Sequence, residues 1–234
     1  GRSVGIFDNP NTLGLFGGLS FWLLIFLRGG VKPSHFYAGI ISSILLVLLS
    51  MSRGSISGFL ISIILFGILN PISMKLKKIM IVLVLLAPLL FLVSYLPMSD
   101  FSRISEISEV ANSGVSGSES LEGRVQAWTE IFNYINQNPT GTLVPPQLVL
   151  LSAPDNQFMY FFAQGGYFLG VMVVLFYVLL LSLTVLSRRP FRSYFLCASV
   201  FFIINGLTMT AMASPVPALY WLIFGGLLKQ PKRE

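Results

Sequence analysis

Long apolar runs alternate with short polar connectors along most of the chain. Runs of about the length that a helix needs to cross roughly 30 Å of hydrocarbon lie near residues 12–27, 34–50, 55–69, 79–97, 157–187, 194–213 and 216–228. The pattern predicts an all-α fold, a polytopic bundle of about seven transmembrane helices. The run 157–187 is longer than one span needs, and Gly165-Gly166 within it predicts a break at the membrane surface.

One connector, residues 98–156, is much longer than most of the others, and long external loops usually carry function or disorder. Its start, "FSRISEISEV", predicts a short surface helix, and the Ser/Gly-rich residues 112–120 predict a flexible tether. Further on, apolar residues recur at steps of four and three, which predicts an amphipathic helix ended by Asn138 and Pro139. The apolar stripe consists of Leu121, Val125, Trp128, Phe132 and Ile135.

This pattern divides the chain into three parts. We expect four membrane helices in residues 1–97, an extracytoplasmic loop in 98–156, and three membrane helices with a cytoplasmic tail in 157–234. The chain starts at Gly1 instead of a methionine and shows no signal peptide. We therefore expect it to be part of a longer protein whose N-terminal portion is missing.

Composition agrees with a membrane protein, since 54% of the residues are hydrophobic, only 10% are charged and the mean hydropathy is +0.80. The net charge of +6 does not indicate a nucleic-acid partner, because the basic residues gather in alternate connectors. If the chain crosses the membrane seven times, eleven of the fifteen basic residues lie on one side of the membrane and eight of the nine acidic residues lie on the other. The positive-inside rule makes the basic side cytoplasmic, so the N-terminus lies outside and the C-terminus inside.

Four arginines lie on the outer side, against this bias: Arg2, Arg53, Arg103 and Arg124. Near a membrane surface an arginine can hold a phosphate through two parallel hydrogen bonds. Arg53 stands in the turn "SMSRGSISG", where Gly54 would let a ligand approach, and its alternative role is an arginine snorkelling from a helix end. Arg124 flanks Trp128 on the loop helix, and an ion pair with Glu122 or Glu130 is the alternative.

The remaining polar candidates indicate less chemistry. Arg2 precedes a turn whose Asn11 is suited to cap the first span, and Arg103 lies among acidic residues in a setting typical of a solvated ion pair. His35 stands alone at the start of the second span, and Cys197 is the single cysteine. With no His/Cys cluster and no Gly-rich nucleotide loop, the sequence predicts neither a metal site nor a cofactor.

Four segments in order, "GRSVGIFDNPNTLG", "SRG", "EGRVQAW" with "NPTG", and "DNQFMYFFAQGGYFLG", resemble the O-antigen ligase and polymerase family. The resemblance covers nearly the whole chain and corresponds to the C-terminal half of such proteins. It implies a metal-independent membrane glycosyltransferase in the bacterial cytoplasmic membrane. Such enzymes take a glycan from undecaprenyl pyrophosphate at the outer face and move it to a sugar hydroxyl, on lipid A core in ligases or on another carrier-linked chain in polymerases.

The resemblance also implies roles for individual residues. Arg53 and Arg124 match the arginines that hold the pyrophosphate, and Arg2, Trp128 and Asn156 are expected to contribute to substrate binding. Where the family has a His-Asn pair, the His being the general base, this chain has Asp155-Asn156. A carboxylate can also accept a proton, so Asp155 is the expected base, with capping of the next helix as the alternative.

The sequence is compatible with more than one function. Within lipopolysaccharide or exopolysaccharide biosynthesis, the missing His slightly favours a polymerase over a ligase. A small-solute or anion transporter of similar topology is the main alternative, although ion-coupled transport usually needs ionisable residues within the spans. The seven runs contain no Asp, Glu, Lys or Arg, and their single histidine, His35, stands at the start of a run. A purely structural membrane protein explains neither the outer arginines nor the long loop.

Overall fold

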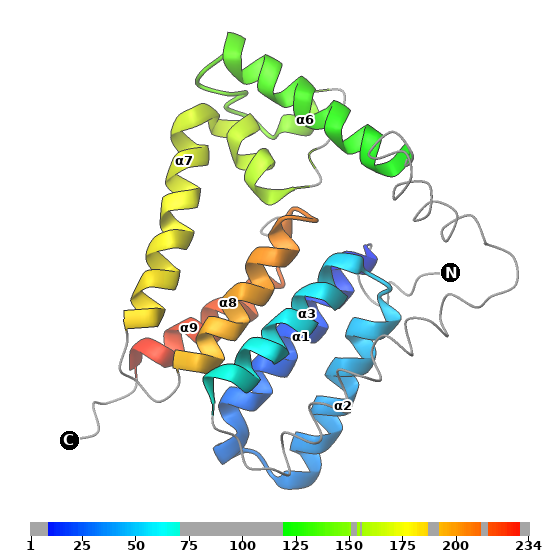
Figure 1. The fold of residues 1–234 in the computed structure, drawn as a ribbon, viewed down its shortest axis with the longest axis vertical. Helices are drawn as coiled ribbons and strands as arrows, with labels where there is room; N and C mark the ends of the chain where they lie inside the picture. The colour runs from blue at the N-terminus through cyan, green and yellow to red at the C-terminus, as the bar shows by residue number, and fades with distance from the viewer. Residues whose placement is uncertain are drawn as a thin grey trace, which may run out of the picture. The chain divides into compact units, whose positions relative to one another are not determined.

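The computed structural model describes residues 9–70, 119–150, 154, 156–186, 192–211 and 215–229, and for 119–122, 124 and 226–229 it describes the backbone alone. These parts of the chain are helical and contain no strand (Figure 1). In chain order the elements are α1 (Pro10–Leu27), η1 (Arg28–Gly30), α2 (Pro33–Leu49), α3 (Arg53–Leu69), α6 (Glu119–Gln137), η3 (Pro146–Leu148), α7 (Gln157–Leu186), α8 (Arg192–Gly206) and α9 (Pro217–Lys229). The predicted all-α class is confirmed for the described residues.

Six of the seven predicted apolar runs coincide with helices, while 79–97 lies outside the described residues. Two helical segments, Pro10–Gly30 and Gln157–Leu186, are long and apolar enough to cross a membrane by length and composition, and α2, α3 and α8 are shorter apolar helices. The run predicted over 194–213 is helical only to Gly206, after which the chain turns. The number of spans therefore stays a prediction.

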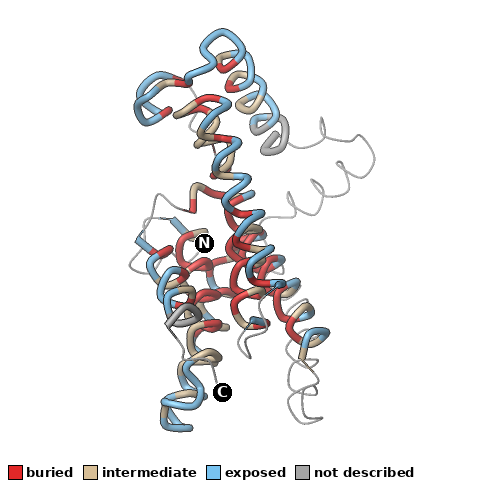
Figure 2. Tube along the Cα trace, turned by 90° about the vertical axis from the view of Figure 1, so that its left-hand side faces the viewer, coloured by how far each residue is buried: buried red, intermediate tan, exposed pale blue. Residues whose placement is uncertain are grey.

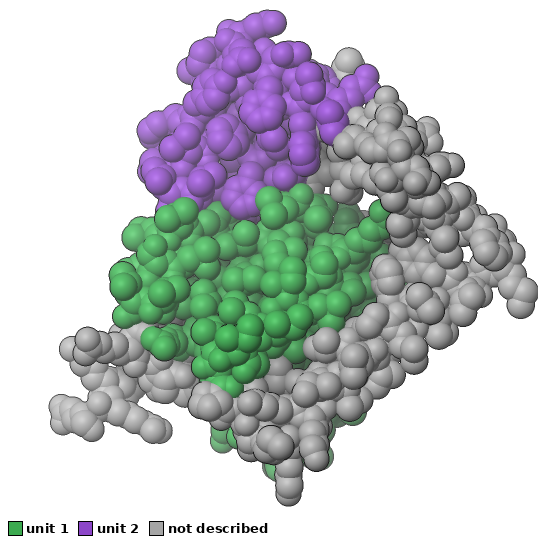
Figure 3. Space-filling model, viewed as in Figure 1, with its two compact units in different colours: residues 1–89, 176–234 green, residues 90–175 purple. Residues whose placement is uncertain are grey.

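The chain forms two compact units, coloured separately in Figure 3. Unit 1 comprises residues 1–89 and 176–234 and contains α1, α2, α3, α8, α9 and the last part of α7. Unit 2 comprises residues 90–175 and contains α6, η3 and the first part of α7. The division predicted at residues 97 and 156 stays a prediction.

Small residues on α1 allow the helices of unit 1 to approach closely. A Cβ added at Gly17 would lie 2.9 Å from the backbone oxygen of Ser43 on α2, and one added at Gly18 would overlap the ring of Phe201 on α8. Close packing through glycine is a common way to join apolar helices when lipid already surrounds them, since the hydrophobic effect then contributes little. Helix α1 therefore lies in the interior of unit 1, against α2, α3 and α8.

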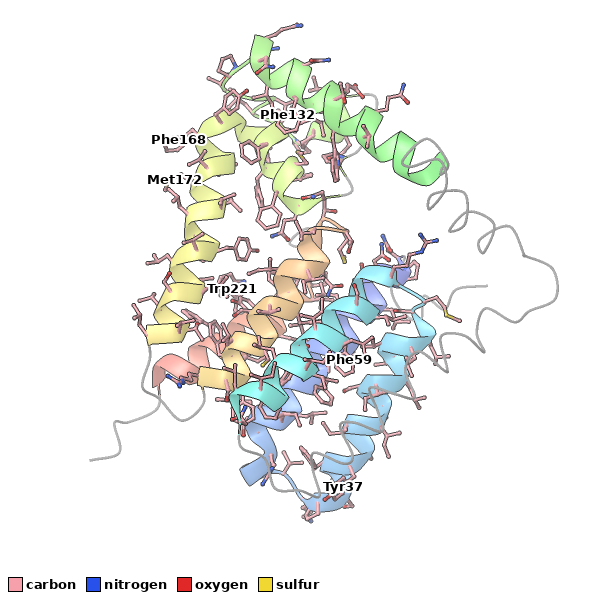
Figure 4. The ribbon with its side chains drawn as sticks, in the orientation of Figure 1. Tyr37, Phe59, Phe132, Phe168, Met172 and Trp221 are labelled. Carbon is pink, nitrogen blue, oxygen red and sulfur yellow. The ribbon has the colours of Figure 1, made fainter. Side chains whose placement is uncertain are left out.

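Aromatic side chains fill the rest of this interior. Phe59 of α3, labelled in Figure 4, packs edge to face on Phe21 of α1, with ring centroids 4.9 Å apart. Phe202 of α8 stacks on Tyr220 of α9 at 4.7 Å. The buried residues gather between the helices (Figure 2), whereas apolar side chains such as Tyr37 on α2 are exposed, as expected of a surface that faces lipid.

Unit 2 has a smaller core, formed where α6 packs on the start of α7. Ile131 and Ile135 of α6 are buried together with Leu150 and Ala163. The apolar face predicted for this helix is therefore partly wrong, because Val125 and Phe132 are 47% and 41% exposed. The helix ends at Gln137, as predicted from Asn138-Pro139.

The two apolar faces of α6 explain this difference. One face carries Ile131 and Ile135, which lie one helical turn apart. The adjoining face carries Trp128 and Phe132, which are also one turn apart, so periodicity alone does not decide which face is buried. The segment after α6 folds back and places Leu150 against the isoleucines. This tertiary contact, which no local pattern encodes, decides which face is buried.

Candidate functional site

Helix α7 is broken at Gly165-Gly166, as the sequence predicts. Gly165 has φ −121° and ψ 17°, and Gly166 has φ 63° and ψ −159°, so neither continues the helix. The break leaves carbonyl groups of the first half and amide groups of the second half without partners inside the helix. It therefore requires hydrogen-bonding groups from elsewhere in unit 2.

The segment that follows α6 supplies those groups. The amides of Thr142 and Leu143 donate to the carbonyl oxygens of Ala163 and Gln164, each at 2.8 Å. In the other direction, the amide of Tyr167 donates to the carbonyl of Pro139 at 3.3 Å. The loop thus holds the break in place from both sides.

Two glycines make this close approach possible. Gly141 and Gly166 both have positive φ, 76° and 63°. A Cβ at Gly141 would lie 2.6 Å from the carbonyl oxygen of Ala163, and one at Gly166 would overlap the carbonyl of Pro139. Only glycine fits at both positions.

Helix α7 is capped by Asn156. The Oδ1 atom of Asn156 accepts hydrogen bonds from the amides of Phe158 at 2.8 Å and Met159 at 3.4 Å, and the side chain is buried. The capping role that was the alternative for Asp155 thus belongs to its neighbour. Asp155 itself lies outside the described residues, and its role as base stays a prediction.

Trp128 presents a buried hydrogen-bond donor on α6. Its Nε1 atom is shielded from solvent and has no hydrogen-bond partner among the described residues. An indole N–H can only donate, and a buried donor without an acceptor is uncommon because it costs free energy. The Nε1 of Trp22, in the interior of unit 1, is equally shielded and unpartnered among the described residues, so this feature does not by itself identify a ligand site. Arg124 precedes it by about one turn of α6, and only its backbone is described.

Arg53 is the first residue of α3, in unit 1, and its side chain is exposed. Ser52 caps the helix, with its side chain accepting a hydrogen bond from the amide of Ser55 at 3.3 Å. The side chain of Thr208 fills the space that a Cβ at Gly54 would occupy, and the expectation that Gly54 lets a ligand approach stays a prediction. Gly54 permits α3 to pack closely on the end of α8.

A buried network of hydrogen bonds close to the start of α3 joins α3 to α8. Ser55 donates from its Oγ to Asn205 Oδ1 at 2.7 Å, and Asn205 Nδ2 donates to the carbonyl of Phe201 at 2.9 Å. Thr208 donates from its hydroxyl to the carbonyl of Asn205 at 3.1 Å. Sequence reasoning assigned this network no role, although Asn205 in an apolar run was its visible signal.

At the start of α1 the capping prediction is also corrected. Asn9, and not Asn11, is the N-cap: its Oδ1 accepts from the amide of Asn11 at 2.8 Å, and Pro10 occupies the first helical position. Proline at that position lacks only an amide that the helix would not use. Arg2 lies outside the described residues.

The predicted site residues are thus distributed over both units. Arg53 belongs to unit 1, whereas Arg124, Trp128 and Asn156 belong to unit 2. Within the described ranges, no three His, Cys, Asp or Glu residues are grouped in a way that would hold a metal ion.

A family model described as O-antigen ligase matches residues 38–174, more than half of the chain. The matched range contains Arg53, Arg124, Trp128, Asp155 and Asn156, and it leaves Arg2 outside. No curated protein and no solved structure matches the chain.

Proposed function

The chain belongs to the O-antigen ligase family, and from that membership we propose that it transfers a glycan from undecaprenyl pyrophosphate to the hydroxyl of an acceptor sugar. Membership itself places the protein in surface-polysaccharide assembly, as a membrane protein of the glycosyltransferase type. The match over residues 38–174 carries the proposal, because it extends from α2 into α7 and contains five of the six site residues.

In the proposed reaction, the acceptor hydroxyl oxygen attacks the anomeric carbon of the donor. The bond from that carbon to the pyrophosphate oxygen breaks, and the pyrophosphate leaves with the electron pair. The hydroxyl proton passes to the carboxylate of Asp155. Arg53 and Arg124 stabilise the charge that develops on the leaving group, since guanidinium groups bind phosphate oxygens through paired hydrogen bonds.

Features of each unit support these roles. The helix that begins with Arg53 is joined to α8 by the bond between Ser55 and Asn205, so the backbone that carries the guanidinium is held in place. In unit 2, the cap formed by Asn156 fixes the start of α7 directly after position 155. We also propose that Trp128 of α6 contributes to substrate binding.

The proposed setting is the bacterial cytoplasmic membrane, crossed several times, with the N-terminal end of this chain outside and the C-terminus in the cytoplasm. The donor reaches the site by diffusion in the outer leaflet. The acceptor is lipid A core if the protein is a ligase and another carrier-linked glycan if it is a polymerase.

Deletion of the gene tests the proposal. A polymerase deletion leaves single-repeat glycans at the cell surface, whereas a ligase deletion leaves carrier-linked polymer and none on lipid A. Electrophoresis of surface glycans and of the lipid-linked pool separates the two outcomes, and the wild-type gene should restore the normal pattern. Unchanged glycans in both pools would refute the proposed transfer.

A further inference from the structure

The loop between α6 and α7 exposes large apolar side chains. Leu143 and Leu148 are each 74% exposed, and their neighbours Val144 and Val149 are also exposed. We call these four residues the apolar loop patch. In a soluble domain, single exposed apolar residues are normal, but four within seven positions are not.

The same part of the chain lacks charge. No charged residue occurs from Ile131 to Pro154. Loops in water are usually rich in polar and charged residues because these solvate the backbone connections. Exposed leucines without neighbouring charges are instead typical of a segment in contact with lipid.

Hydrogen bonds fix the depth of this loop relative to α7. Residues 167–186 follow the break and form an uninterrupted helix about 30 Å long at 1.5 Å per residue, the thickness of the hydrocarbon layer. A helix of this length that spans the bilayer has its first residue, next to the break, at one boundary of the hydrocarbon. The amides of Thr142 and Leu143 bond to Ala163 and Gln164, directly before the break, so the loop lies at the same level.

The exposed apolar surface continues onto α7. Phe168, two residues beyond the break, is 78% exposed, as is Met172 one turn further along at 50% (Figure 4). Val171 and Leu175 of the same helix are also exposed. It belongs to a helix that is long and apolar enough to span the membrane, so its chemistry suits contact with acyl chains. The apolar loop patch begins at Leu143, whose amide donates to the carbonyl of Gln164, four residues before Phe168 in the sequence.

The backbone of Leu143 has an unusual conformation. Leu143 has φ 57°, a conformation that non-glycine residues adopt rarely and at a cost in free energy. The bond from its amide to Gln164 holds this conformation while its side chain remains exposed. The backbone thus holds an apolar side chain at the surface, and its burial in lipid would offset the cost of this conformation.

We propose that the apolar loop patch, Leu143, Val144, Leu148 and Val149, inserts into the outer leaflet of the bilayer and anchors unit 2 at the membrane surface. The partner is the acyl-chain region of bulk lipid and not an anionic headgroup, since no basic residue adjoins the patch in sequence. The anchor keeps α6, with Trp128, close to the level at which lipid-linked substrates present their polar groups.

Site-directed spin labelling of the protein in lipid nanodiscs tests this proposal. With Cys197 replaced by alanine, a label is attached to Leu148→Cys, and a second variant carries it at Leu143→Cys in case one fails to fold. Both labels should be more accessible to oxygen, which concentrates in acyl chains, than to a water-soluble nickel chelate. The matched control is Gln126→Cys, an exposed polar position on α6 of the same unit, where the nickel chelate should be favoured several-fold more.

Lipid composition distinguishes acyl-chain insertion from headgroup binding. The accessibility ratio at position 148 should be the same in nanodiscs of phosphatidylcholine alone as in nanodiscs rich in phosphatidylglycerol. A ratio at 148 equal to that of the control would place the patch in water. Low accessibility to both reagents would mean that another protein segment covers it, and dependence on phosphatidylglycerol would mean headgroup binding. Each of these three results overturns the proposal.

Discussion

The hydroxyl of Ser55 donates a 2.7 Å hydrogen bond to Asn205 Oδ1, joining α3 to α8 inside a fully buried interface. Asn205 uses its amide nitrogen for the carbonyl of Phe201, so both ends of its side chain are bonded. In an apolar interior such a pair has no water to replace a missing partner. The pair therefore fixes the position of α3, which begins with Arg53, relative to α8.

Replacement of this serine should weaken unit 1. Ser55→Ala leaves the buried Asn205 oxygen without its donor, at a cost of about 0.6–2 kcal/mol by comparison with interhelical bonds in membranes. The single cysteine, Cys197, is buried in α8, so its reaction with a fluorogenic maleimide on heating reports unfolding in detergent. We expect a lower midpoint temperature. Ser57→Ala is the control, because that exposed hydroxyl bonds only within its own helix, and an equal shift in both variants would contradict the assignment.

The break in α7 should not tolerate a side chain. Gly166→Ala forces alanine into a conformation that is essentially restricted to glycine, at about 1–3 kcal/mol from backbone strain alone, and its Cβ overlaps the Pro139 carbonyl. We expect hydrogen exchange at the amides of Thr142 and Leu143 to become much faster. Gly123→Ala, an open position on α6, should leave that exchange unchanged. Protected amides in the Gly166 variant would show that the loop holds the break without the glycine.

Lysine should not replace the two arginines of the proposed site. Arg53→Lys and Arg124→Lys each keep the charge but lose the paired hydrogen bonds to a phosphate, and we expect transfer to fall by about 10²- to 10³-fold, as for loss of one donor to a developing charge. The measurement is transfer of labelled glycan in membranes with equal amounts of inserted protein. Arg28→Lys, in the exposed turn after α1, should keep normal activity. Normal transfer by both lysine variants at 53 and 124 would make these arginines structural.

The proposed role of Asp155 as base can be tested without disturbing the helix cap formed by Asn156. Asp155→Asn removes the proton acceptor, while the cap formed by Asn156 remains, so transfer should be abolished with no change in stability. Asp155→His introduces another side chain that accepts protons near neutral pH, and it should retain part of the activity. Wild-type transfer rates in Asp155→Asn would exclude the residue as base.

The topology prediction can be checked by labelling. With Cys197 replaced, cysteines at Ser116 and at Lys77 lie on opposite sides of the predicted membrane threading. An impermeant thiol reagent added to intact spheroplasts should label position 116 alone. Labelling of position 77 alone would reverse the orientation assigned from the charge distribution.

Local features of the sequence determined the positions of the helices. Apolar runs bounded by Pro, Gly and Asn predict helices because backbone hydrogen bonding in lipid leaves few other solutions, and six of the runs are helices in the structure. The break at Gly165-Gly166 was also predictable, since two adjacent glycines lower the cost of leaving the helix. In each case the residues that start, end or break a helix lie within a few positions of that point in the sequence.

Tertiary structure decided what these local features do. Gly54 provides room for Thr208, which is more than 150 positions away in the sequence. The face of α6 that contains Ile131 and Ile135 became the buried one because Leu150 and Ala163 pack on it. Periodicity and residue type show that a position is small or apolar, but the neighbour that contacts it is chosen by packing between segments that are distant in sequence, and only the folded chain brings them together.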